Sequence, residues 1–365
     1  MPTLLLRSLL CLGLLLAFAC GGETPVVTTL APSDRPVERT YTFTHDVPPR
    51  LQWNENSGYC GETSFICAGL FLGQYCSQFT ARELASPGVP QSDPSSQLLL
   101  GVNDRRAAEM MRLQTIEFDT GAQRSTDEFL AWVKSQTLAG HIVIIGVFNN
   151  GIILGEWTSV EDGDSQYDHI GPVLGIKSRQ PFDTHVGEYL PEDQLTFCDN
   201  GLFGPSVGFP PTMYQFLFDY TFKDFPGTRV EANNPNGPIY MLRNTPPNYG
   251  VAVTGVVDPD RVTIPVRLRS SSDTEPQIAH HGNVPPEPVP ITLTATVSLP
   301  DPSASYNLYL YDSFEKVPTT GFNAAAGNAA RVWAIPPGSG SEFTVELNVL
   351  SDRTVIFRAV PATAP

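Results

Sequence analysis

The sequence is poor in positive charge. It has 22 Lys and Arg against 38 Asp and Glu in 365 residues, which gives a formal net charge of −16 at pH 7. A protein that binds nucleic acid needs a basic face to displace the counterions of the phosphates. The charge balance therefore predicts that nucleic acid is not a partner of this protein.

Long apolar runs and metal-ligand spacings are also missing. After the first 19 residues no apolar run reaches the length of a transmembrane helix, which needs about 20 residues. No set of His, Cys and Asp has the close spacing of a zinc site, so we predict neither a metal nor another cofactor. Because 41% of the residues are hydrophobic, the chain can bury the core of about two domains.

The N-terminus has the pattern of an export signal. Residues 1–19 carry one positive side chain, Arg7, followed by an apolar run from Leu9 to Phe18 that is too short to span a bilayer. We predict a signal peptide at 1–19 and a secreted protein, with a polar tether at 20–44. Cys20 before two glycines also resembles a lipoprotein acceptor site, so anchoring through Cys20 is the alternative to simple secretion.

Two regions with different periodicity follow the tether. Residues 45–225 mix helical segments with short buried strands, which predicts an α+β domain. Residues 226–246 are rich in Pro, Asn and Gly and are predicted to be a linker. From 247 to 365 the residues alternate with a period of two, which predicts a β-sandwich. The predicted helices are "YCGETSFICAGLFLGQY" and "STDEFLAWVKSQTLAG", and the predicted strands of the first domain are "HIVIIGVF", "IGPVLGI" and "QLTFCD".

Cys60 lies where the first predicted helix begins. The positive end of the helix dipole and the unpaired amides there favour the thiolate, which is the attacking form of a cysteine. Gly58 and Gly61 beside it are expected to let a carbonyl substrate approach the sulfur. The alternative is a disulfide, because an exported chain with Cys60, Cys67, Cys76 and Cys198 can form two bridges. Cys60 and Cys67 are two helical turns apart, about 10 Å, which is too far for a bridge between them.

A thiolate nucleophile needs a base, a residue that orients the base, and donors for an oxyanion. His169, with Asp168 beside it, lies at the entry of one predicted strand, and Asp199 and Asn200 lie at the exit of the next. Amide side chains precede the cysteine at three positions: Gln52, Asn54 and Asn56. His141 follows a helix-ending glycine, so we interpret it as a helix-end residue.

The order of a glutamine, "CG" at the start of a helix, "HIVIIGVF", "DHIGPVLGI" and "LTFCDNG" resembles the papain-like cysteine peptidases of the bacteriocin-processing type. The resemblance covers roughly residues 47–220. It implies that Cys60 is the nucleophile, His169 the general base, Asp199 the residue that orients the imidazole, and Gln52 the donor to the oxyanion. The family places its amide nearer to the cysteine, where this chain has Asn54, so Asn54 is the alternative to Gln52. The family often has Pro or a small residue after "CG", where Glu62 stands here and would oppose thiolate formation if it faced the sulfur.

The predicted function is therefore a secreted thiol hydrolase that cleaves amide bonds in a peptide or protein. The sandwich would bind a cell surface, a glycan or a protein. The alternative is a non-catalytic papain-like scaffold that acts as a surface-binding or structural protein.

Overall fold

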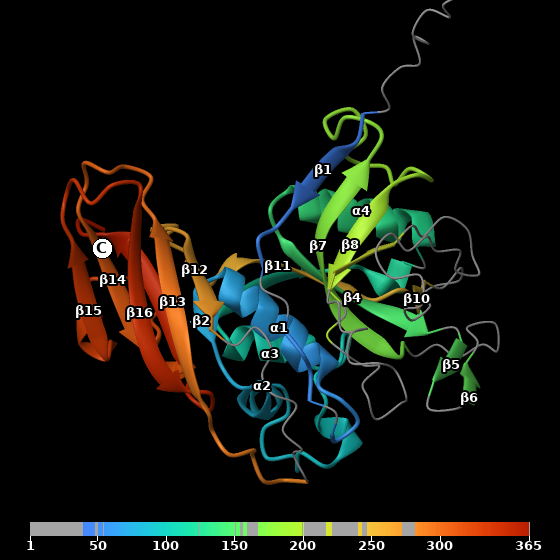
Figure 1. Cartoon of the computed structure of the whole chain (residues 1–365), viewed down its shortest axis with the longest axis horizontal. Coiled ribbons are helices and arrows are strands. Elements are labelled where there is room, and N and C mark those ends of the chain that lie inside the picture. Colours follow the sequence, from blue (N-terminus) through green and yellow to red (C-terminus); the bar gives the residue numbers. More distant parts are fainter. Residues whose placement is uncertain are drawn as a thin grey trace, which may run out of the picture. The chain divides into compact units, whose positions relative to one another are not determined.

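The computed structural model describes residues 39–47, 50–53, 55–122, 124–149, 151–153, 156–158, 167–198, 200, 217–220, 240–242, 247–271 and 282–364. The helices in this part of the chain are α1 (Cys60–Phe71), α2 (Gln78–Ala85), α3 (Asp104–Met110) and α4 (Thr126–Leu138), with short 3₁₀ turns η1 (Pro94–Ser96), η2 (Thr120–Ala122), η6 (Phe314–Lys316) and η7 (Ala326–Asn328). Figure 1 shows their arrangement.

The strands outnumber the helices. They are β1 (Tyr41–Thr44), β2 (Gln74–Tyr75), β3 (Leu113–Glu117), β4 (Ile142–Asn149), β5 (Gly151–Ile153), β6 (Glu156–Thr158), β7 (His169–Ser178), β8 (Gln194–Cys198), β9 (Leu217–Tyr220), β10 (Tyr240–Met241), β11 (Gly250–Val256), β12 (Val266–Ser270), β13 (Pro290–Ser298), β14 (Tyr306–Tyr311), β15 (Arg331–Ile335), β16 (Glu342–Leu350) and β17 (Val355–Pro361).

The largest sheet has the strand order β3-β11-β4-β7-β8-β9, with β1 added beside β7 and β10 beside β4. All of its pairings are antiparallel. Two smaller antiparallel sheets have the orders β12-β13-β16 and β15-β14-β17-β2, and β5 pairs with β6. The protein is thus a mixed fold of several antiparallel sheets and few helices in its described part, in agreement with the predicted α+β class.

Strand β4 is buried on both faces. Ile142 and Ile144 belong to the apolar core that also contains Phe65 and Ile66 of α1. Val143 and Ile145 alternate to the other face, where they pack in a second core with Phe129, Leu130 and Val133 of α4. Because successive side chains of a strand point to opposite faces, a continuous apolar run such as "IVII" is what a strand between two layers requires.

Helix α4 begins and ends as its sequence predicts. Ser125 and Glu128 form a capping box, in which the Ser125 side chain accepts from the Glu128 amide and Glu128 accepts from the Ser125 amide. Gly140 follows the helix with a positive φ of 94°. A buried ion pair fixes the helix to the segment before β8, because Lys134 Nζ lies 2.7 Å from Asp193 Oδ2. The predicted helix at 125–140 and the predicted strands β4, β7 and β8 are confirmed. The helix predicted at 59–75 is confirmed only as far as Phe71, because Gln74 and Tyr75 form the strand β2.

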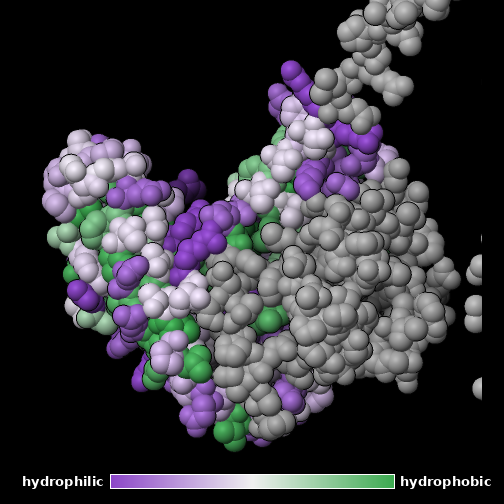
Figure 2. Space-filling view, in the orientation of Figure 1, coloured by the Kyte–Doolittle hydropathy of each residue, from purple (hydrophilic) through white to green (hydrophobic). Residues whose placement is uncertain are grey.

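The two smaller sheets share one apolar core. Strand β13 alternates buried and more exposed residues, and its buried side chains Leu293 and Val297 belong to the same cluster as Leu308 of β14 and Ala359 of β17. Over these strands, Figure 2 shows hydrophilic and hydrophobic residues interspersed on the outer surface. This is the pattern of strands that keep one face in a core and one in water.

The predicted boundary at 226–246 falls almost entirely outside the described residues and stays a prediction. Strand β11, which the prediction puts in the sandwich, lies between β3 and β4 in the largest sheet. In the other direction, β2 from the first region pairs with β17. One apolar cluster contains Phe65 of α1 and Leu293 of β13, and residues Arg39–Pro365 form one compact unit. The alternation of β11 correctly predicts a strand, but alternation does not specify which sheet a strand joins.

Residues 1–38, which include the predicted signal peptide, lie outside the described residues. In the part of the chain that the structure describes, no helix has the length and apolar character needed to cross a membrane.

Candidate functional site

Cys60 is the first residue of α1. Its thiol is free and half-buried, and no side chain caps the helix N-terminus at Tyr59. The first amides of an α-helix have no partner within the helix and carry the positive end of its dipole. Cys60 therefore has a free thiol at an end of the helix that favours negative charge.

The turn before Cys60 has an unusual backbone. Asn56, Ser57 and Gly58 have φ angles of 53°, 66° and 87°, so three successive residues lie in the left-handed region. Such a conformation is costly for Asn and Ser and persists only where neighbouring groups hold it. Arg82 supplies that restraint, because its guanidinium donates to the carbonyls of Asn56, at 2.9 Å, and of Gly58.

Arg82 also neutralises Glu62. The Arg82 Nε lies 2.6 Å from Glu62 Oε1 with both side chains buried, and Glu62 Oε1 also accepts from the Leu98 amide at 3.0 Å. Burial raises the pKa of Glu62, and the Arg82 ion pair opposes that rise. The guanidinium in addition lies 3.6 Å from the centre of the Tyr59 ring. The Glu62 carboxylate, which could oppose thiolate formation at Cys60, is thus paired with the Arg82 guanidinium of α2.

Gly61 allows a close approach of three segments. A Cβ at this position would lie 2.0 Å from the carbonyl oxygen of Leu98 and 3.3 Å from Ile170 Cδ1. The expectation that Gly61 opens space for a substrate is therefore wrong, since the space is filled by the chain itself. Gly58 differs, because its φ is positive and a Cβ there would lie 3.0 Å from Gln52 Oε1, and both features favour glycine in the turn.

Asn200 joins the segments that carry the predicted site. Its Nδ2 donates to the carbonyl of Cys60 at 2.9 Å and to the carbonyl of Ile170 at 3.0 Å, and it lies 3.3 Å from Ser64 Oγ. The backbone carbonyl of Asn200 accepts from the backbone amide of Gln52 at 2.7 Å. The residue is fully buried. One amide side chain therefore holds the start of α1 against β7.

His169 is the first residue of β7 and pairs with Val147 of β4. It is fully buried and directly precedes Ile170, whose carbonyl accepts from Asn200. The structure thus brings the backbone at Cys60 and the strand end that carries His169 to the same place. Asp199, the predicted orienting residue, lies outside the described residues, while its neighbour Asn200 is the residue that makes these contacts.

Gln52 lies beside the start of α1. Its Oε1 accepts from the amide of Tyr59 at 2.8 Å, one residue before Cys60. Its Nε2 is buried and has no hydrogen-bond partner among the described residues. A buried donor without a partner is costly and needs a reason. Asn54, the alternative amide, lies outside the described residues, and the Nδ2 of Asn56 donates to Tyr59 Oη and to the Gly282 carbonyl.

Tyr167 is a neighbour of Cys60 that the sequence analysis missed. Its hydroxyl donates to the Leu100 carbonyl at 2.9 Å, and its ring lies against Gly146, where a Cβ would come within 2.7 Å of it. Burial, followed by the charge of Cys60, raises the pKa of Tyr167. The sequence carried a signal for this contact. Tyr167 lies two residues before His169, and in an extended chain residues two apart point to the same side.

The remaining cysteines and histidines lie elsewhere. Cys67 is a free, buried thiol of α1, and Cys76 and Cys198 are buried as well. His141 Nδ1 lies 2.8 Å from Gln136 Oε1 at the end of α4, which confirms its interpretation as a helix-end residue. Within the described ranges, no three His, Cys, Asp or Glu side chains are grouped so that they could hold a metal ion.

No protein-family model, curated protein or solved structure matches this chain. The function is therefore argued from the geometry of the site.

Replacing Asn200 by Asp tests whether its side chain links the start of α1 to β7. The substitution keeps the shape of the side chain but turns the Nδ2 donor into an oxygen that faces the carbonyls of Cys60 and Ile170. We expect the free energy of unfolding to fall by about 2 kcal/mol, because a buried oxygen would replace the amide donor that two carbonyls share, and the Ser64 hydroxyl, which also binds both carbonyls, has a single proton to donate. Urea unfolding measures the loss. The control is Asn348→Asp, on the exposed face of β16, where a change within about 0.5 kcal/mol is expected. Equal stability of the two variants would contradict the linking role.

Proposed function

We propose that the protein is a secreted thiol hydrolase of the papain-like cysteine peptidase type, which cleaves amide bonds in a peptide or protein through an acyl-enzyme on Cys60. The observation that carries the proposal is the Asn200 side chain, which binds the carbonyls of both Cys60 and Ile170. It places a free thiol at a helix N-terminus next to the strand end that begins with His169.

The proposed reaction begins when His169 takes the proton of the Cys60 thiol. The thiolate attacks the carbonyl carbon of the scissile amide, and the negative charge that develops on oxygen is stabilised by Gln52 Nε2 and by the Cys60 amide. His169 then gives its proton to the leaving amine, and the acyl group stays on Cys60. Water, activated by His169, hydrolyses the thioester and releases the acid. In this proposal Asp199 orients the imidazole.

The local charges support this reaction. Glu62 is neutralised by Arg82, so it does not oppose the negative charge on the sulfur. The uncapped amides at the start of α1 favour that charge. The Nε2 of Gln52, without a partner among the described residues, belongs to a side chain that binds the Tyr59 amide, one residue before the nucleophile. These three features supply what a thiolate nucleophile needs from its surroundings.

A second candidate rests on burial. His169 and Gln52 are both fully buried, and only Cys60 of the three is partly exposed. This favours the alternative of a non-catalytic papain-like scaffold that acts as a surface-binding or structural protein. In either case we propose that the two smaller sheets bind a cell surface, a glycan or a protein, and that the chain is exported, with anchoring through Cys20 as the alternative to free secretion.

Turnover of a mixed peptide library, followed by mass spectrometry of the products, separates the two candidates. The enzyme proposal predicts cleavage by the unchanged protein and none by Cys60→Ala. For His169→Gln it predicts a rate lower by about 10²- to 10⁴-fold, which is the usual contribution of a general base. The matched controls are Cys67→Ala on the same helix and His141→Gln. Cleavage that survives Cys60→Ala, or a loss as large in His141→Gln as in His169→Gln, would contradict the assignment.

The same assay tests the amide donor. We expect Gln52→Ala to lower the rate by about 10²-fold through loss of oxyanion stabilisation, while Asn54→Ala is nearly silent. Because Gln52 Oε1 also accepts from the Tyr59 amide, Gln52→Glu is a useful second variant, since it keeps that acceptor while it replaces the donor by a carboxylate oxygen that repels the oxyanion. The reverse result, with Asn54→Ala slow and both Gln52 variants active, would assign the donor to Asn54.

A further inference from the structure

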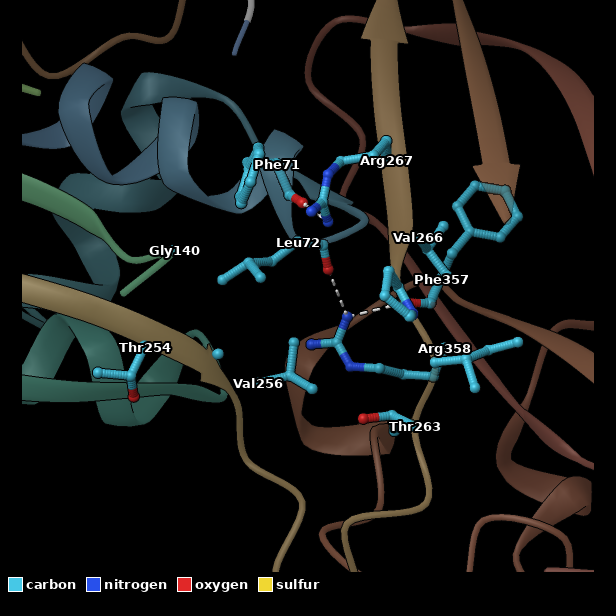
Figure 3. A pocket seen from close by; sticks show the side chains of 13 residues that line it. Phe71, Leu72, Gly140, Thr254, Val256, Thr263, Val266, Arg267, Phe357 and Arg358 are labelled. Carbon is cyan, nitrogen blue, oxygen red and sulfur yellow. Dashed lines mark hydrogen bonds between the residues drawn. The ribbon is translucent and has the colours of Figure 1, made fainter. Parts of the chain in front are cut away.

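A cavity of about 320 Å³ lies at the C-terminal end of α1, the opposite end from Cys60. Its walls come from the helix end, from the end of β11, from β12 and the segment before it, and from β17. Figure 3 shows the side chains that line it, among them Phe71, Leu72, Thr254, Val256, Thr263, Val266, Arg267, Phe357 and Arg358. None of these residues belongs to the candidate site described above.

Two guanidinium groups face this cavity. Arg267 donates to the carbonyl of Phe71 at 2.5 Å and lies 3.6 Å from the centre of the Phe71 ring. Arg358, which is 2% exposed, donates to the carbonyls of Leu72 and Phe357 and to Gln74 Oε1. Every one of these acceptors is a neutral oxygen.

Neither guanidinium forms an ion pair with a carboxylate among the described residues. The carboxylates whose charges reach them do not bind them directly. Asp46, near Arg267, pairs with Arg269, and Asp258, near Arg358, accepts from the amide and hydroxyl of Thr263 with Oδ2, while its Oδ1 is buried without a hydrogen-bond partner among the described residues. The arginines cap the last carbonyls of α1, but a helix C-terminus carries only about half a negative charge. The two guanidinium charges are therefore offset only in part, by the helix end and by the charge of Asp258.

Burial makes the remaining positive charge costly. It lowers the pKa of Arg358 to about 9 and also lowers the pKa of Arg267. A buried charge is normally paired, because its removal from water is not otherwise offset. An anion in the cavity would supply the missing partner, and guanidinium groups bind carboxylates through charge-assisted hydrogen bonds.

The other walls suit an apolar body. Phe71, Leu72, Ile264 and Pro265 line the cavity with apolar surface, while Thr254 and Thr263 add hydroxyl groups. The volume is at the lower end of the range for small-molecule sites, which is about 300 to 1,000 Å³. We propose that this cavity binds a small carboxylate with an apolar body, held by Arg267 and Arg358.

Thermal unfolding with benzoate as the probe tests the proposal, with benzamide as the neutral molecule of the same shape and chloride adjusted to constant ionic strength. Ligands that bind only the folded state raise the unfolding midpoint. We expect benzoate to raise it by about 2 °C or more as its concentration increases, and benzamide to leave it unchanged. Equal shifts with both compounds, or no shift with benzoate, would overturn the proposal.

Variants assign the effect to the cavity. Arg267→Gln is expected to abolish the benzoate shift, while Arg105→Gln, at an exposed ion pair of α3, is expected to keep it. Because Arg267 also caps α1, a second variant leaves both arginines in place. Val256→Phe adds a ring beside Arg358 and should reduce the shift by occupying the space (Figure 3). A benzoate shift that persists unchanged in both cavity variants would show that the carboxylate binds elsewhere.

Discussion

The side-chain amide of Asn200 is the contact on which the geometry of the candidate site depends. Its Nδ2 donates to carbonyls of α1 and β7, and the backbone carbonyl of Asn200 accepts from the Gln52 amide. A typical neutral hydrogen bond contributes only about 0.5–1.5 kcal/mol to stability, but a buried carbonyl left without its donor costs about 1–3 kcal/mol. Because Asn200 is fully buried, these bonds are hard to replace by water. The position of Cys60 relative to β7 is thereby fixed by Asn200, which follows β8, together with Ser64 of α1, whose hydroxyl also binds the carbonyls of Cys60 and Ile170.

A second constraint acts on the turn that precedes Cys60. The turn at Asn56, Ser57 and Gly58 has left-handed backbone angles, and Arg82 binds two of its carbonyls while it pairs with Glu62. A buried ion pair gains little net stability because of the desolvation of both charges, so its value here is in specifying one geometry. The pair removes the effect of a carboxylate two residues after Cys60 and fixes the turn that leads into the helix. The left-handed turn and the buried ion pair are thus both costly for stability, and both fix the position of the Cys60 thiol.

The sequence predicts the local elements well because their causes are local. Ser125 and Glu128 are three residues apart and cap α4, and the apolar run at β4 is buried on both faces. The role of Gly61 was not predictable, since it depends on Leu98, which is distant in sequence. The sheet of β11 was not predictable either, because the apolar pattern of a strand does not specify its neighbours, and β11 and β13 lie in different sheets. For the site, the order of residues predicts that Cys60 and His169 lie near each other, while the contacts of Asn200 with three segments follow only from the fold.

The most direct test of this account is the alkylation of individual cysteines by iodoacetamide in the folded protein, measured by peptide mass spectrometry as a function of pH. Cys67, buried on the same helix, is the internal reference. We expect Cys60 to react at least about tenfold faster than Cys67 at neutral pH, because Cys60 is the more exposed thiol and because the helix end and His169 favour its thiolate. In His169→Gln the reaction of Cys60 should be slower. Equal rates for Cys60 and Cys67, or a Cys60 profile that His169→Gln leaves unchanged, would contradict the claim that these two residues form one catalytic unit.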